Sequence, residues 1–235
     1  MVFITGDTHR TEFEHIWEFC EEYETTTEDV MVILGDVGIN FEGEPNDSEL
    51  KRELSELPIT LLCVHGNHEM RPETIRTYDE EDRFGGVVYM EEEFPNLLFA
   101  KCGEIYELDG NRCLVIGGAN SIDKHKRIAG VNWWEDEQPS DYIKERVEAR
   151  LDKEKWRVDV VFTHTCPYKY MPKEYLNQYI KQSHVDNSTE RWLQYIEERL
   201  NYNEWYCGHF HGDTFSGRLR VVFREIHELS ESLYI

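Results

Sequence analysis

The chain has 235 residues, of which 40% are hydrophobic and 13% aromatic, and its formal net charge is −23. This length and apolar content are sufficient for a packed α/β core, and we expect residues 1–235 to form a single domain. The net charge disfavours non-specific binding to nucleic acid, and no run approaches the roughly 18 apolar residues that span a bilayer, so we expect no membrane segment.

The start of the chain and its cysteines indicate a reducing compartment. The first apolar run begins at Val2, which leaves no room for the basic and apolar regions of a signal peptide. The six cysteines are scattered without a C-x-x-C pair, a pattern typical of buried thiols rather than of disulfides. Cys166 and Cys207 could also be metal ligands, but packing is the favoured interpretation. We therefore expect a cytoplasmic protein.

The first third of the chain alternates strands with helices. Three apolar runs predict strands, at 2–5, 30–34 and 59–64. Apolar residues at helical spacing predict two helices between them, one over 11–23 and one that is capped by Asp47 or Ser48 and stopped by Pro58. This β-α-β-α-β order implies parallel strands with right-handed crossovers.

The remainder of the chain predicts a second group of strands and two further helices. Short strands are expected at 87–89, 97–99, 104–108 and 113–116, with a hairpin turn at Asp109-Gly110. Helices are expected at 140–155 and 189–200, strands before His164 and at 203–207, and a final hairpin around Ser216-Gly217. Two sheets packed face to face with helices outside fit this order.

Residues 118–138 form a long loop that is rich in polar and aromatic side chains. A loop of that length is usually functional or disordered. Trp133 and Trp134 within it could stack on a base or a sugar, but an aromatic lid that packs on the sheet is the favoured interpretation.

Five short blocks of Asp, Asn and His residues follow these strands. In chain order they are Gly6-Asp7-Thr8-His9, Gly35-Asp36, Gly66-Asn67-His68-Glu69, His164 and Gly208-His209-Phe210-His211. In α/β proteins, ligands and catalytic groups converge at the carboxyl ends of strands. The Asp, Asn and His residues of the blocks offer two carboxylates, one amide oxygen and five imidazoles, which are too many for one metal ion but suit two.

The order and spacing of the five blocks resemble the calcineurin-like metallophosphoesterase superfamily, whose pattern is D-x-H, G-D, G-N-H-[DE], H and G-H-x-H. The resemblance spans residues 2 to about 211, and the five blocks in order are far more specific than any one of them. It implies a metallo-dependent phosphatase fold, an α/β four-layer α/β/β/α sandwich with two mixed sheets. It also implies hydrolysis of a phosphate ester by metal-activated water.

The resemblance implies a role for each block residue. Asp36 would bridge two ions, because a bridging ligand needs two oxygens and a full charge. The remaining ligands would be Asp7, His9 and His211 at one ion, and Asn67, His164 and His209 at the other. Mixed imidazole and carboxylate ligands suit Mn²⁺, Fe²⁺, Ni²⁺ or Zn²⁺ better than Ca²⁺. His68 would protonate the leaving group, or alternatively would orient its neighbours.

The residues after Asp36 depart from one branch of the superfamily. Its Ser/Thr protein phosphatases continue with x-x-Asp-Arg, whereas this chain has Ile39 and Asn40. Asn40 could still donate to a phosphate oxygen, but without charge, and Arg71 or Arg10 could compensate for the missing guanidinium. For both arginines, a structural ion pair is at least as good an interpretation.

These observations favour a dimetal phosphoesterase, a phosphodiesterase or a phosphatase, whose substrate is a small phosphoester or a nucleotide. Without an Arg fork we expect small diesters to be cleaved at least as well as monoesters and better than phosphopeptides. A Ser/Thr-type protein phosphatase and a nuclease are the enzymatic alternatives. A non-catalytic scaffold on the same fold is disfavoured because the ligand blocks are intact. The sequence leaves the substrate, the physiological metal and the oligomeric state open.

Overall fold

The computed structural model describes residues 1–10, 13–176, 179 and 185–229. The helices are α1 (Glu14–Tyr23), α2 (Asn46–Ser55), α3 (Asp141–Lys153) and α4 (Ser188–Arg199). The first sheet contains, in spatial order, β13 (His227–Glu228), β1 (Val2–Thr5), β2 (Val30–Ile33), β3 (Thr60–Cys63), β6 (Leu97–Ala100), β5 (Gly86–Met90) and β4 (Asp79–Arg83). The second contains β11 (Thr214–Ser216), β12 (Leu219–Val221), β10 (Glu204–Cys207), β9 (Val160–Thr163), β8 (Asn111–Ile116) and β7 (Ile105–Leu108).

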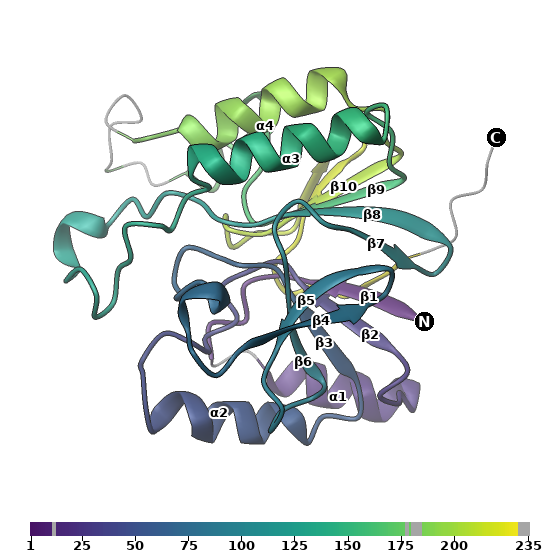
Figure 1. Cartoon of the computed structure of the whole chain (residues 1–235), viewed down its shortest axis with the longest axis vertical. Helices are drawn as coiled ribbons and strands as arrows, with labels where there is room; N and C mark the ends of the chain where they lie inside the picture. Colours follow the sequence, from purple (N-terminus) through teal and green to yellow (C-terminus); the bar gives the residue numbers. More distant parts are fainter. Residues whose placement is uncertain (11–12, 177–178, 180–184, 230–235) are drawn as a thin grey trace.

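The two sheets pack face to face between two pairs of helices (Figure 1). Helices α3 and α4 cover the second sheet, and α1 and α2 cover the first. The apolar core between the sheets includes Val32 and Leu62 from the first sheet and Phe162 from the second, all of them fully buried. The predicted α/β/β/α sandwich with two mixed sheets is therefore confirmed.

The direction of the strands decides where their ends meet. Strands β1, β2 and β3 are parallel neighbours, with Val2 beside Val30 and Val30 beside Thr60. Strands β8, β9 and β10 are likewise parallel. The carboxyl ends of each set therefore lie at one edge of each sheet, which brings the loops that follow them together. The parallel strands predicted for the first third of the chain are confirmed.

The start of α2 differs from the prediction. The helix begins at Asn46 after Pro45, and neither Asp47 nor Ser48 caps it. The Asp47 carboxylate instead accepts hydrogen bonds from the backbone N–H groups of 41–43, at 2.8 to 3.4 Å. The side chain is thus committed to the preceding loop, and the predicted cap is wrong.

The edge strand β4 is not among the elements that the sequence predicts. Its sequence, Asp-Glu-Glu-Asp-Arg, has no apolar alternation and favours a solvated surface. It pairs antiparallel with β5 at the edge of the first sheet, where its side chains remain exposed or half-buried. Backbone pairing with a neighbour forms this strand in spite of its side chains, so no local pattern could reveal it.

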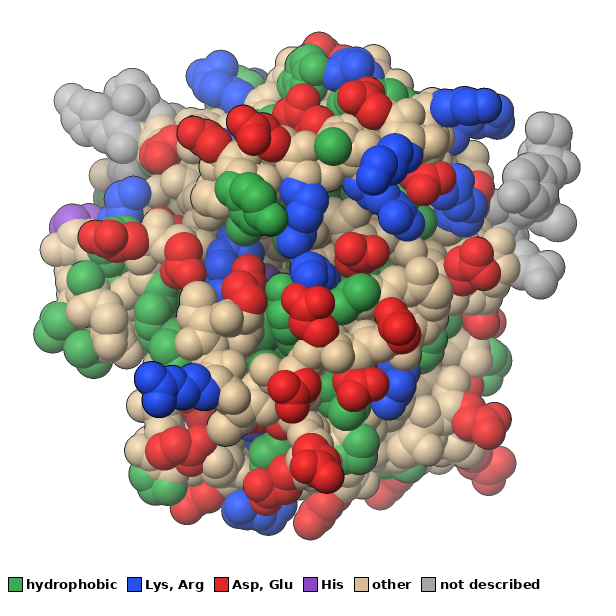
Figure 2. Space-filling view, in the orientation of Figure 1, with side chains coloured by type: hydrophobic (Ala, Val, Ile, Leu, Met, Phe, Trp, Pro, Cys, Tyr) green, Lys and Arg blue, Asp and Glu red, His purple; other side chains and the backbone are tan. Residues whose placement is uncertain are grey.

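The surface carries the excess of acidic residues. Asp and Glu side chains are scattered over the face shown in Figure 2, interspersed with Lys and Arg. All six cysteines are buried and free, as predicted. Within the described ranges, none of the helices combines the length and the apolar character that crossing a bilayer requires.

Candidate metal centre

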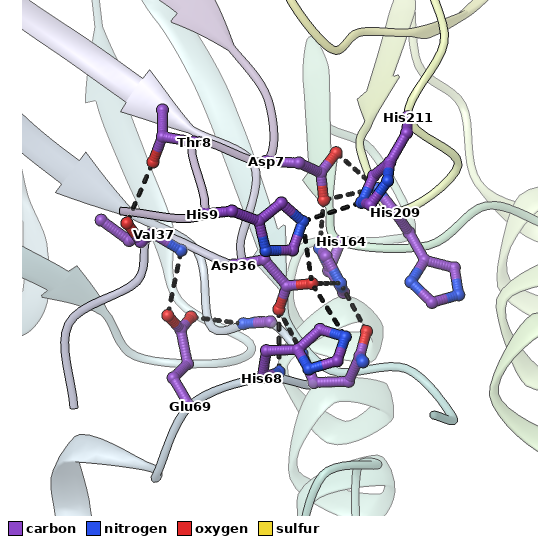
Figure 3. A network of polar contacts seen from close by, with 12 residues as sticks. Asp7, Thr8, His9, Asp36, Val37, His68, Glu69, His164, His209 and His211 are labelled. Carbon is purple, nitrogen blue, oxygen red and sulfur yellow. Dashed lines mark hydrogen bonds and ion pairs between the residues drawn. The ribbon is translucent and has the colours of Figure 1, made fainter. Parts of the chain in front are cut away.

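The sheet edges bring all five sequence blocks to one place (Figure 3). We call the seven residues predicted as ligands the ligand cluster, which consists of Asp7, His9, Asp36, Asn67, His164, His209 and His211. They follow β1, β2, β3, β9 and β10, so five strands from both sheets contribute. Residues from the two ends of the sequence therefore meet because of the parallel strand order.

Asp36 occupies the centre of the cluster and is 1% exposed. Its Oδ2 atom lies 3.5 Å from Nε2 of His164 and 3.9 Å from Nε2 of His9. Its Oδ1 atom accepts the backbone N–H groups of Asn67 and His68, at 2.9 and 2.8 Å. One oxygen is thus held by the backbone, and the other faces imidazoles from both sides of the cluster.

Two imidazoles meet on the open side of the cluster. Nε2 of His9 lies 2.7 Å from Nε2 of His211, and the two rings cross edge to face. Donor atoms of Asp7, His9 and His211 all lie within 4.8 Å of one another, and the same holds for Asp7, Asp36 and His164. Imidazole nitrogens and carboxylate oxygens brought this close form the kind of donor set that divalent transition metals prefer, so the residues present fit such ions.

Asn67 and His209 lie beside these two groups. The Asn67 amide oxygen is 2.8 Å from Nε2 of His164, and its NH₂ group donates to the Ser121 hydroxyl at 2.9 Å. The backbone N–H of His209 donates to both Asp7 oxygens, and its ring centroid is 5.0 Å from that of His164. His209 is in neither group of donor atoms found among the described residues.

The charges of the cluster depend on one another. Burial would raise the pKa of the Asp36 carboxyl, but the imidazoles of His164 and His68 hold it well below its usual range. Burial opposes a charge on His164, yet Asp36 and Asp7 raise the pKa of that imidazole to about 10. Burial lowers the pKa of His9 to about 4. The cluster therefore pairs the buried Asp36 carboxylate with a charged His164 imidazole, beside the neutral His9 ring, whose nitrogen can donate an electron pair.

The backbone of the cluster is strained. Asp36, His9 and His211 have φ angles of 49°, 43° and 50°, in the left-handed region that non-glycine residues seldom adopt. His209 follows with 71°. Such conformations persist only where the surrounding structure enforces them, and they concentrate at functional sites.

Gly66 shows how closely the backbone packs here. A Cβ atom at this position would lie 2.1 Å from Oδ1 of Asp36 and 2.3 Å from its backbone nitrogen. A side chain at 66 would therefore push Asp36 away from its neighbours. The glycine of the Gly66-Asn67-His68-Glu69 block is thus required by the position of Asp36.

Glu69 connects two of the ligand loops. Its carboxylate accepts the Gly66 N–H at 2.6 Å and the Val37 N–H at 3.1 Å, and the side chain is fully buried. Burial, aided by Asp36, raises its pKa to about 8. The sequence analysis gave Glu69 no role. In the structure its two hydrogen bonds connect the loop after β2 to the loop after β3.

A cleft of about 420 Å³ opens over the cluster. Its wall includes Asp36, His68 and His211, together with Asp123, Arg127 and Glu190, which the sequence analysis did not single out. Arg127 belongs to the long loop of residues 118–138, and one of its nitrogens lies 3.5 Å from the His68 ring. Only the fold reveals this approach, because no motif surrounds Arg127.

A family model described as calcineurin-like phosphoesterase matches residues 1–213. The chain belongs to this family. The five blocks of the cluster all lie within the matched residues, so the resemblance that the sequence indicated is confirmed. No curated protein has a significant sequence match to this metallophosphoesterase.

Two solved structures are similar to this chain. TT1561 of Thermus thermophilus is 13% identical to the metallophosphoesterase, with a TM-score of 0.54 over 94% of this chain and 87% of that chain. The phosphopantetheinyl hydrolase PptH of Mycobacterium tuberculosis is 14% identical, with a TM-score of 0.42 over 95% and 89%. At such identities the similarity to TT1561 shows a shared fold and nothing finer.

The two residues predicted to bind substrate lie outside the cleft of this metallophosphoesterase. Asn40 is 2% exposed, and its amide is paired with the Tyr78 hydroxyl at 3.0 Å. Arg71 is 3% exposed, and its Nε donates to the backbone oxygen of Asp136 at 2.7 Å. Neither side chain is among the residues that line the cleft, and their contact with substrate stays a prediction.

Arg10 was the other candidate for a phosphate clamp. Its Nη2 donates to the Asn46 backbone oxygen at 3.2 Å, and Nη1 lies 3.4 Å from Glu42. The structural ion pair that the sequence offered as an alternative is therefore what the fold contains. A different cation, Arg127 of the 118–138 loop, lines the cleft.

Proposed function

We propose that this chain is a dimetal phosphoesterase that hydrolyses a small phosphoester. The observation that carries the proposal is the position of Asp36, whose Oδ2 lies 3.5 Å from His164 and 3.9 Å from His9. A buried carboxylate with ring nitrogens on both sides is suited to bridge two cations. When bound, two divalent cations would supply an activated water and charge stabilisation on the phosphate.

The ligand cluster divides into two sets around Asp36. We assign Asp7, His9 and His211 to one ion, because their donor atoms lie within 4.8 Å of one another. We assign Asn67, His164 and His209 to the other, on the 2.8 Å approach of the Asn67 oxygen to His164 and the adjacent ring of His209. The identity of the metal stays open among Mn²⁺, Fe²⁺, Ni²⁺ and Zn²⁺.

His68 is the proposed proton donor. Its ring lines the cleft, and Nε2 lies 3.9 Å from Asp36, so it faces the same space as the ligands. Its backbone N–H is fixed by Asp36 Oδ1, which limits where the ring can move. A proton delivered from Nε2 to the ester oxygen would let the alcohol leave neutral.

The size and charge of the cleft favour a small substrate. A volume of about 420 Å³ suits a small phosphoester or a nucleotide, and Asp123, Asp186 and Glu190 line it. These carboxylates, with the net charge of −23, disfavour polyanions and acidic phosphopeptides. The assignment of residues 1–235 to one domain and a cytoplasmic location stay predictions.

A hydrolysis panel with added Mn²⁺ tests the proposal. It compares monoesters, diesters, cyclic nucleotides, dinucleoside polyphosphates and phosphopeptides, with Asp36→Asn as the matched inactive control. We expect turnover of at least one small phosphoester and about two ions per chain by elemental analysis. A chain that binds well under one equivalent and hydrolyses none of them would be a scaffold, and the proposal would be wrong.

A further inference from the structure

Arg127 stands apart from the other cations of this acidic protein. Among the residues that the structure describes, it is the one Lys or Arg in the wall of the cleft. It follows the short turn Lys124–Lys126 in the 118–138 loop, and its side chain is 17% exposed. A single guanidinium therefore faces the space that is bounded by His68 and Asp36.

The contacts of Arg127 fix the direction of its guanidinium. Nε donates to Oδ1 of Asp123 at 2.8 Å, and Nη1 donates to the backbone oxygen of Asn132 at 3.2 Å. Both partners belong to the 118–138 loop, so the loop itself positions the guanidinium. Nη2 is left on the opposite side, toward the metal centre.

Among the described parts of the chain, Nη2 has no strong acceptor. It contacts Nε2 of His68 at 3.5 Å, which is at the far limit of hydrogen bonding. A guanidinium has five N–H donors in a planar fork that matches phosphate oxygens, and the loop contacts use Nε and Nη1 only. An anion between Arg127 and His68 would satisfy the remaining donors.

We propose that Arg127 donates a hydrogen bond to a non-bridging oxygen of the substrate phosphate beside His68, and that this contact enables the cleft to bind phosphomonoesters. A monoester phosphate is dianionic at neutral pH, so it gains more from one added cation than the monoanionic phosphate of a diester. Arg10 and Arg71 are bound elsewhere in the fold and are not available for this task. The inference rests on the proposed function, since it assigns a substrate class to the same cleft.

The test compares Arg127→Ala and Arg127→Lys with Lys126→Ala in the full-length protein loaded with Mn²⁺. Lys126 is the matched control because it is exposed and carries the same charge one residue away. For Arg127→Ala we expect kcat/KM for a nitrophenyl monoester to fall about 10- to 100-fold, the loss of one charge-assisted hydrogen bond. The value for the corresponding diester should fall much less, and Lys126→Ala should change neither. Arg127→Lys should retain part of the monoester activity.

Two further measurements distinguish direct binding of phosphate by Arg127 from a role of Arg127 in ordering the loop. Added guanidinium ion in the millimolar range should restore part of the monoester activity of Arg127→Ala. By calorimetry, inorganic phosphate should bind the wild type at least about tenfold more tightly than Arg127→Ala. Thermal melting identifies any variant that fails to fold, in which case Arg127→Lys decides the outcome.

The outcomes distinguish this inference from the proposed function. An inactive wild type would contradict the proposed function, and phosphate binding would still decide the role of Arg127. An active wild type with equal monoester losses in Arg127→Ala and Lys126→Ala would overturn the inference alone. A full loss in Asp123→Ala, with no guanidinium rescue of Arg127→Ala, would also overturn it, because loop ordering would then explain the effect.

Discussion

The ligand cluster and the 118–138 loop meet at one cleft but are built differently. In the cluster, Asp7, Asp36 and His164 are at most 1% exposed; the two carboxylates accept backbone N–H groups, and the His164 ring donates to the backbone oxygen of Leu34. In the loop, Ile128 and Val131 are 63% and 60% exposed. The cluster is positioned by sheet edges, whereas Arg127 is positioned by contacts within its own loop. One fold thus combines a buried set of proposed metal ligands with a proposed substrate contact whose support comes from its own loop.

Asp36→Asn should produce the largest effect in either region. An amide cannot bridge two cations as a carboxylate does, so both ions should bind weakly. Loss of their charge stabilisation, several kcal/mol, should lower kcat/KM by about 10³-fold or more. Elemental analysis after dialysis gives the metal content, and His211→Ala, which should mainly affect one ion, is the comparison. Two tightly held ions in Asp36→Asn would show that the bridging assignment is wrong.

His68→Ala should keep the ions and lose turnover. A positioned general acid contributes about 10²- to 10⁴-fold, so esters with poor leaving groups should lose about that much. Nitrophenyl esters, which need little protonation, should lose far less. The measurement is kcat across a series of leaving groups at constant metal content. The same loss along the whole series would remove the general-acid role from His68.

The difference between the two regions also explains what the sequence could predict. The blocks were recognisable because each lies directly after an apolar strand. Parallel pairing aligns the strand ends within each sheet, and the packing of the two sheets then brings Asp36 and His164 together. Arg127 has no such local sign: its place beside His68 depends on how a long loop folds back over the cleft. Arg71 sits next to a ligand block in sequence, yet the chain turns it toward Asp136. Position directly after a strand therefore predicted which side chains would converge, whereas sequence proximity to a block did not predict the direction in which Arg71 points.

The same contrast applies to the fold. Strands with apolar runs were predicted to within about a residue or two, because burial on both faces leaves a clear pattern. Strand β4 and the start of α2 were not, because one depends on pairing with β5 and the other on the Asp47 carboxylate turning toward 41–43. In both cases a partner elsewhere in the chain outweighs the local propensity.

Asp123→Ala should have a smaller effect that sharpens the comparison. The Asp123 carboxylate is 42% exposed and its ion pair with Arg127 spans 2.8 Å. Exposed pairs contribute up to about 1 kcal/mol, so a loosened Arg127 should cost monoesters no more than about fivefold in kcat/KM. Diester hydrolysis and metal content should not change. A loss of metal in this variant would mean that the loop and the cluster are one structural unit, contrary to the comparison.

The smallest effect is expected from Gly130→Ala. The matched comparison is Gly66→Ala, at a glycine that packs against the ligand cluster. Gly130 has a φ of 74°, but a Cβ atom there meets nothing within 4 Å, so the cost is backbone strain of about 1 kcal/mol. At Gly66 the same methyl group would lie 2.1 Å from Asp36 Oδ1 and must displace it. Thermal melting and elemental analysis should therefore show a small drop in stability with full metal content for Gly130→Ala, and metal loss for Gly66→Ala. If Gly130→Ala lost metal as readily as Gly66→Ala, the loop would support the ligands directly, and Arg127 could no longer be treated as a replaceable addition to a finished metal site.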